Sequence, residues 1–127
     1  KIDTSMNASR NAMKNLVIDV FNDEEGIDKD RSDYEYDPVN RSIKNGVVVS
    51  KAEFSSFVPT TILLSADYSV TDGSIVFEVS RDGGNTWSVV NPDVIHNVSL
   101  QPQGKYVVVR ATLTGDAELR AWGYSWS

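Results

Sequence analysis

The residues with the clearest capacity for chemistry are the acidic side chains between positions 19 and 37. This segment carries nine of the eighteen aspartates and glutamates of the 127-residue chain. Calcium takes several oxygen ligands, and the loop NDEEGID can supply carboxylates and carbonyls around a turn at Gly26. The candidate ligands are Asp23, Glu25 and Asp28, but the spacing of an EF-hand is absent. A solvated acidic loop is the favoured interpretation, and a calcium site is the alternative.

A second group of interest is the set of alternating aromatics near the end of the chain. Trp122, Tyr124 and Trp126 are spaced to lie on one face of a strand. Rows of aromatics stack sugar rings in carbohydrate-binding surfaces, and they also fill the cores of sandwiches. The residues between them are too small to plug a core, which favours the core interpretation. Tyr106 is a further candidate for an exposed stacking surface.

The sequence holds no complete catalytic constellation. His96 is the one histidine and there is no cysteine, which is poor evidence for a zinc site or for the base of a nucleophile. Glycoside hydrolysis needs two carboxylates that face each other across a groove, and nothing in the sequence pairs Glu78, Asp82 or Glu118. We therefore expect a non-enzymatic protein without a cofactor, calcium excepted.

Composition narrows the classes of partner. The net charge is −6 and the isoelectric point about 4.6, which argues against binding the phosphate backbone of nucleic acid. No apolar run has the length of a membrane span. The chain begins with Lys1 rather than methionine, so we interpret it as a piece of a longer polypeptide.

The stretch SRDGGNTW, between the apolar runs SIVFEV and SVV, is the clearest local signal. The run before it alternates with the period of a half-buried strand. Asp82 can accept bonds from nearby backbone N–H groups, and Gly83 and Gly84 can adopt positive φ, so the stretch predicts a hairpin turn. Thr86 can cross-link the turn through its hydroxyl, and Trp87 can lock the hairpin onto the core.

These residues match a known motif. Ser80, Asp82, Gly84, Thr86 and Trp87 fit SxDxGxTW, so the stretch resembles the Asp-box, or bacterial-neuraminidase repeat. In sialidases this motif lies in a peripheral hairpin of each propeller blade, which implies a structural role. A propeller needs several blades, whereas this chain carries one copy, so a sialidase is disfavoured.

The rest of the chain predicts an all-β fold. Short β-branched and aromatic runs, separated by Gly, Pro and Asn signals, recur with almost no helical periodicity. They predict a two-sheet antiparallel β-sandwich over residues 16–127, with jelly-roll or galactose-binding-like topology. Residues 1–15 are expected to form an arm or a linker from a preceding domain. The longest expected strands cover residues 16–21, 62–68, 74–79, 94–100, 106–113 and 119–126.

The layout carries a broader resemblance. The order is an acidic loop holding GID, then VVVSKA, VPTTILLSA, the SRDGGNTW hairpin and VVVRATLTGDAELRAWGYSW. It is similar to the β-sandwich domains of bacteriophage tail, fibre and baseplate proteins. That resemblance implies an extracellular virion domain with a structural and host-adhesion role. The implied partners are other virion subunits and further copies of the chain in a homo-oligomer, of which a trimer is one form, and the candidate ligand is a cell-surface glycan. The layout also resembles galactose-binding-like modules, which implies a carbohydrate-binding module of a secreted glycoside hydrolase.

Overall fold

The computed structural model describes residues 9–127, which are almost entirely β-structure. They hold ten strands, one short 3-10 helix, η1 (Lys29–Arg31), and no α-helix. No helix within this range is long and apolar enough to cross a membrane. The strands are β1 (Arg10–Met13), β2 (Leu16–Asp19), β3 (Asp33–Asp37), β4 (Ser42–Val49), β5 (Glu53–Phe54), β6 (Thr61–Ser69), β7 (Ser74–Ser80), β8 (Ser88–Val90), β9 (His96–Asn97) and β10 (Tyr106–Trp126).

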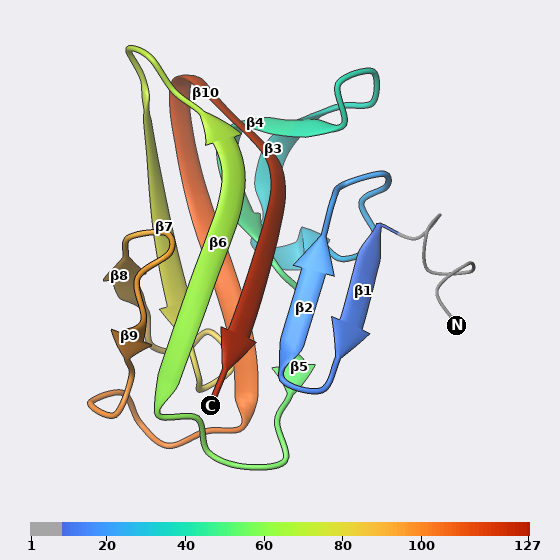
Figure 1. Ribbon diagram of the computed structural model, residues 1–127. Helices are drawn as coiled ribbons and strands as arrows, with labels where there is room; N and C mark the ends of the chain where they lie inside the picture. The colour runs from blue at the N-terminus through green and yellow to red at the C-terminus, as the bar shows by residue number, and fades with distance from the viewer. Residues whose placement is uncertain (1–8) are drawn as a thin grey trace.

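Strand β10 organises the fold because it belongs to both layers of the sandwich. Its first half pairs with β7 along one edge, and with β4 and β5 along the other. Its second half pairs with β6 and β2. Figure 1 shows β10 rising, bending over the top of the molecule and descending, while β6 and β7 follow the same path as separate strands.

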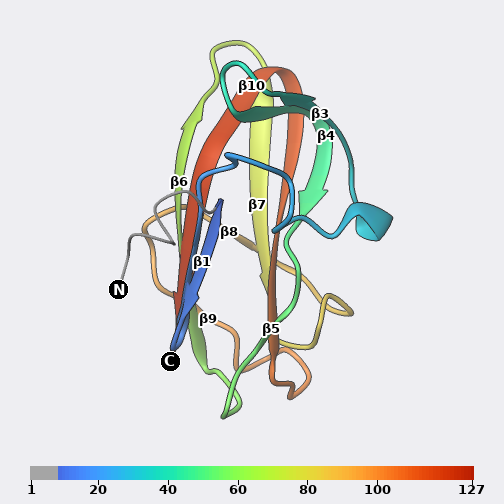
Figure 2. The ribbon, with the colours of Figure 1, turned by 90° about the vertical axis from the view of Figure 1, so that its right-hand side faces the viewer.

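The two layers confirm the predicted all-β sandwich. One layer contains β1, β2, the second half of β10, β6 and β9, and the other contains β3, β4, the first half of β10, β7 and β8. The strand pairs are antiparallel throughout, and Figure 2 shows the layers from the side. The jelly-roll or galactose-binding-like topology is a finer statement that stays a prediction.

The bend of β10 lies at Gly115 and Asp116, between the two strands that the sequence predicted over residues 106–113 and 119–126. Gly115 has φ of +66°, a conformation that glycine adopts without a Cβ penalty. The Asp116 carboxylate accepts hydrogen bonds from the backbone N–H groups of residues 71–73 at 2.8 to 3.2 Å. The top of β10 is therefore fixed to the loop between β6 and β7.

The core lies between the layers and is lined by alternate residues of β10. In the first half the residues of the core cluster are Val107, Val109, Ala111 and Leu113, and Val108 is buried outside that cluster. The pairing register with β6 shifts between Leu119 and Ala121, so one extra residue moves the inward positions from odd to even numbers. Trp122 therefore faces the core, and it contacts Phe21 with ring centroids 5.8 Å apart.

The amino-terminal boundary differs from the prediction. Residues 10–13, expected to belong to an arm or linker, instead form the edge strand β1, paired in register with β2. Val20 N–H also donates to the Ser9 carbonyl at 2.9 Å. The sandwich thus includes these residues, and the rest of the expected arm, residues 1–8, lies outside the described part of the chain.

Candidate functional site

The SRDGGNTW hairpin is held together by its own polar groups. The Ser80 hydroxyl donates to the Asp82 carboxylate at 2.6 Å and accepts from the N–H groups of Asp82 at 3.2 Å and Gly84 at 3.0 Å. Asp82 also accepts from the Thr86 N–H at 2.9 Å. Burial raises the pKa of Asp82, but the hydrogen bonds from Ser80 and Thr86 outweigh it, so the pKa lies below its usual value.

The turn presses against η1. Gly83 and Gly84 have φ of +75° and +90°, as expected of glycines in a tight turn. Arg31 of η1 donates through Nη1 to the Gly83 carbonyl at 2.6 Å. A Cβ on Gly84 would overlap the Arg31 guanidinium, so glycine at this position permits the close approach of the helix.

Trp87 does not lock the hairpin onto the core as predicted. Its ring is partly buried and the Arg110 guanidinium lies over it, 4.1 Å from the ring centroid. Arg110 is held in turn by two bonds to the Glu78 carboxylate at 3.0 and 2.9 Å. The ring therefore contributes a cation–π contact on the outer face of the β7–β10 layer.

Arg81 is a structural residue that the sequence did not single out. Its side chain is buried, 4% exposed, and its guanidinium donates to four backbone carbonyls rather than to a carboxylate. No local sequence signal marks it, because the acceptors come from distant loops. They belong to Pro59 at 2.8 Å, Ser99 at 3.1 Å, Pro102 at 3.2 Å and Gln101.

The candidate calcium ligands do not converge. Asp23 accepts from the Glu25 N–H at 3.0 Å, and Asp28 accepts from the Asp30 N–H at 3.2 Å as the cap of η1. Asp28 also lies 3.5 Å from Arg31 Nε. Over residues 9–127 no group of three or more acidic or histidine side chains is placed to hold a metal ion. Calcium binding by Asp23, Glu25 and Asp28 stays a prediction that this geometry does not support.

A polar hollow of about 480 Å³ lies beside these carboxylates. Acidic and basic side chains line it together, among them Glu24, Glu25, Lys29 and Lys51. Lys29 lies 3.7 Å from the Glu24 carboxylate. Since charges of both signs share the wall, the hollow does not select an anion or a cation.

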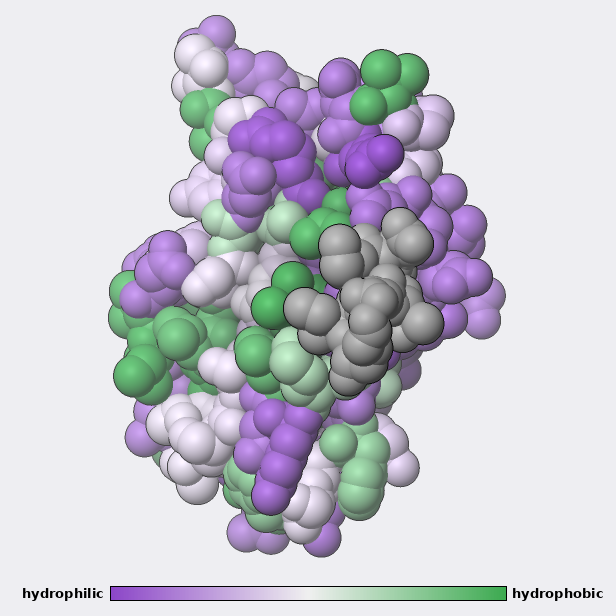
Figure 3. All heavy atoms as spheres, turned by 45° about the vertical axis from the view of Figure 1, so that its right-hand side comes forward, coloured by the Kyte–Doolittle hydropathy of each residue, from purple (hydrophilic) through white to green (hydrophobic). Residues whose placement is uncertain are grey.

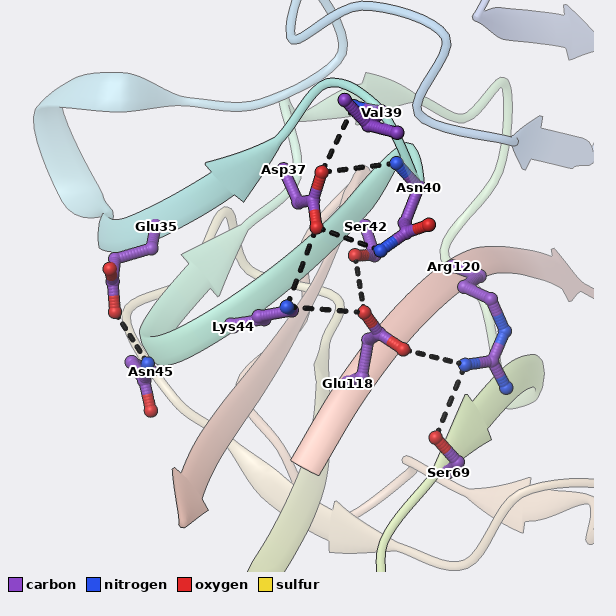
Figure 4. A network of polar contacts seen from close by, with 10 residues as sticks. All are labelled: Glu35, Asp37, Val39, Asn40, Ser42, Lys44, Asn45, Ser69, Glu118 and Arg120. Carbon is purple, nitrogen blue, oxygen red and sulfur yellow. Dashed lines mark hydrogen bonds and ion pairs between the residues drawn. The ribbon is translucent and has the colours of Figure 1, made fainter. Parts of the chain in front are cut away.

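Two carboxylates do approach each other at the top of the sandwich, where Lys44 lies between Asp37 and Glu118 (Figure 4). The ammonium is 3.4 Å from Asp37 and 3.6 Å from Glu118. Glu118 also accepts from Ser42 at 2.7 Å and from Arg120 at 3.1 Å. Hydrogen bonds, first of all from the Asn40 N–H, hold the pKa of Asp37 below its usual value.

This network is suited to structure rather than to proton transfer. A general acid needs a carboxyl group whose pKa is raised, whereas the pKa of Asp37 is lowered. Both carboxylate oxygens of Glu118 are in ion pairs, one with Lys44 and the other with Arg120. Glu78 is bound to Arg110 and Asp82 to its own turn. The carboxylates named as candidates for hydrolysis are thus each engaged elsewhere, and the network joins β3, β4, β6 and β10.

One carboxyl group does have a raised pKa. Asp19, at the end of β2, is 1% exposed, and burial raises its pKa against the opposing hydrogen bonds from Ser9 and the Phe21 N–H. These bonds measure 2.6 and 3.0 Å. The group joins β2 to the preceding segment.

Three of the four predicted stacking residues lie in the core. Trp122, Tyr124 and Trp126 are 2, 1 and 5% exposed, so they are unavailable to a sugar, and the core interpretation is the right one. Tyr106 is different, because half of its side chain is exposed and it contacts Phe54, which is 58% exposed. The sequence did not single out Phe54 as a stacking candidate, since only the pairing of β5 with β10 brings the two rings together.

Other apolar side chains also reach the surface, and Figure 3 shows hydrophobic areas at several places, with an extended one at the left of the view. Around β8 and β9 the exposed residues are Val89, Val94 and Ile95, at 65, 55 and 69%. Both strands are at the edges of their layers. An apolar sheet edge of this kind is suited to contact with another polypeptide.

No protein-family model, curated protein or solved structure matches this chain.

Proposed function

We propose that this chain is a non-enzymatic domain of a virion appendage, such as a phage tail, fibre or baseplate, with a structural and host-adhesion role that includes contact with a cell-surface glycan. The observation that carries the proposal is the exposed pair Phe54 and Tyr106, two large rings in mutual contact on paired strands. Exposed aromatics offer large apolar faces, which suit the C–H faces of sugar rings.

The state of the polar side chains supports binding rather than catalysis. Asp82 is bound within its turn, Glu78 to Arg110, and Glu118 to Lys44 and Arg120. The buried Asp19 carboxyl is bound to Ser9 and to a backbone N–H. Side chains that already hold the fold are not free to carry a reaction.

The charge and layout of the chain support the extracellular assignment. A net charge of −6 disfavours nucleic acid as the partner. The resemblance to phage appendage domains, and the single Asp-box in a structural hairpin, support a virion location. The exposed apolar residues at β8 and β9 support assembly into a homo-oligomer or with other virion subunits.

A carbohydrate-binding module of a secreted glycoside hydrolase is the second candidate, and the same pair, Phe54 and Tyr106, favours it. The two candidate functions predict different surroundings for this chain in its gene and genome. Virion structural genes on either side support the appendage, whereas a catalytic domain on the same polypeptide supports the hydrolase module.

A glycan array probed with the 127-residue chain, with and without calcium, tests the proposed function. We expect binding to at least one glycan. Retention of the same signals after chelation would count against calcium at Asp23, Glu25 and Asp28. Absence of binding to every glycan and to intact bacterial cells would contradict the adhesion role. Light scattering tests the oligomer, and a monomer at all concentrations would count against self-assembly.

A further inference from the structure

We infer that Phe54 and Tyr106 form the sugar-binding platform of this protein, and that its ligand is a soluble single glycan chain rather than a crystalline polysaccharide surface. The inference rests on the proposed function and assigns it a place, a binding mode and a ligand class.

The platform is fixed in position by the backbone around it. The Gly83 N–H donates to the Tyr106 carbonyl at 3.0 Å, and the Tyr106 N–H donates to the Arg81 carbonyl at 3.3 Å. On the other side the Ser55 N–H donates to the Lys105 carbonyl at 2.7 Å. Both ring-bearing residues therefore lie on anchored backbone, and a preorganised site loses less conformational entropy when it binds a ligand.

The angle between the rings distinguishes the two kinds of ligand. The ring centroids of Phe54 and Tyr106 are 5.6 Å apart and the ring planes are inclined by 61°. A crystalline polysaccharide presents a flat face, which two coplanar rings would match and two inclined rings do not. A free chain can turn between successive sugars, so each ring can meet the apolar face of a different sugar.

Arg31 supplies a hydrogen-bond donor on the turn that binds the Tyr106 backbone. Arg31 binds the Gly83 carbonyl through Nη1 at 2.6 Å and lies 3.5 Å from Asp28 through Nε. About half of its side chain is exposed, and its Nη2 group has no partner within residues 9–127. Since Arg31 and the backbone of Tyr106 both bind Gly83, this donor is available to a hydroxyl of a sugar bound at that turn.

The decisive measurement is calorimetric titration with free chains, namely cellohexaose, xylohexaose, hexagalacturonate and the strongest ligand found on the glycan array. We expect Tyr106→Ala and Phe54→Ala each to weaken binding of the best ligand at least tenfold, and Tyr106→Phe to retain most of it because the ring face is kept. Arg31→Ala is expected to weaken binding to a smaller extent. Leu100→Ala, which removes a fully exposed aliphatic side chain, is the matched control and should leave affinity unchanged.

Sedimentation with microcrystalline cellulose and with crystalline chitin tests the ligand class, and the protein should stay in solution. Unchanged melting temperatures of the two alanine variants establish that they fold. If the wild-type chain binds a glycan and both alanine variants bind it equally well, the platform is wrong while the adhesion role stands. Cosedimentation with either crystalline polymer that is lost in Tyr106→Ala would overturn the ligand class. If the wild-type chain binds no glycan at all, the proposed function fails together with this inference.

Discussion

Replacing Asp82 by alanine tests whether the SRDGGNTW hairpin depends on its own side chains. The substitution removes the acceptor of the Ser80 hydroxyl, at 2.6 Å, and of the Thr86 N–H, at 2.9 Å. A hydrogen bond to a charged group contributes about 1.5–3 kcal/mol, and partial exposure of this carboxylate lowers that figure. We expect a loss of about 1–3 kcal/mol in the free energy of unfolding, which corresponds to about 4 °C in Tm for each kcal/mol.

Thermal unfolding followed by circular dichroism at pH 7 measures this loss. Asp72→Ala is the matched control, because Asp72 is exposed and its carboxylate accepts no hydrogen bond within residues 9–127. Ser80→Ala and the double variant complete a cycle, in which the combined loss should be smaller than the sum because the two residues share a bond. An unchanged Tm for Asp82→Ala, or an equal fall for Asp72→Ala, would refute the reasoning.

The effect of Asp82→Ala on stability should also depend on pH, in a direction that the pKa of Asp82 determines. The pKa of Asp82 is lower in the folded protein than in the unfolded chain, so its contribution to stability is present above the unfolded value and disappears as the pH falls through the folded value. The difference in Tm between wild type and Asp82→Ala should therefore narrow below about pH 4. A difference that stays constant down to pH 2 would assign the effect to packing instead of the charge.

The remaining predictions concern the core and two buried polar groups. Trp122→Ala removes a core ring that is 2% exposed and should destabilise by about 3–5 kcal/mol; a urea unfolding midpoint equal to that of wild type would contradict its place in the core. Arg81→Met leaves several loop carbonyls without their donor and should cost more than about 3 kcal/mol, with amide exchange increasing around Pro59 and Ser99 while the β6–β10 pairs stay protected. Asp19→Asn keeps an acceptor for both donors and imitates the protonated acid. The pKa of Asp19 is raised in the folded protein, so the wild type loses folding stability as the pH rises through that value and the buried carboxyl becomes charged. The neutral asparagine keeps that stability, so the variant should be the more stable at pH 7 and equal to wild type in acid. A less stable variant at pH 7 would show that the Asp19 charge is favourable.

The sequence predicted the layers better than their boundaries. Alternation marked the strands that line the core, and the gap between the expected strands 106–113 and 119–126 falls where β10 bends. The sequence did not predict that both halves form one strand. The bend is held by hydrogen bonds that the Asp116 carboxylate accepts from residues 71–73, which are far away in the chain. Strand β1 was missed for a related reason, since its polar sequence RNAM becomes a strand through pairing with β2.

In the candidate site, too, contacts between residues close in sequence were predicted and contacts between distant segments were not. The bond that Asp82 accepts from the Thr86 N–H is local, so the sequence predicted this role of Asp82 correctly. The surroundings of Trp87 are not local, because the Arg110 that covers the ring is more than twenty residues away in the chain. The partner of Tyr106 was also hidden, since Phe54 reaches it only through the register of β5 on β10.

The hairpin and the pair Phe54 and Tyr106 are connected through backbone hydrogen bonds. Arg81 and Gly83, the neighbours of Asp82 in the turn, are the residues whose backbone groups bond to Tyr106. The side chains of Ser80 and Asp82 fix that turn from within, whereas the Tyr106 backbone binds the turn and its ring is half exposed. A motif with a structural role can thereby determine how firmly Tyr106 is held, and a firmly held side chain loses less conformational entropy when it binds a ligand. Under the proposed function, the motif would therefore contribute preorganisation of Tyr106 rather than a contact with the glycan.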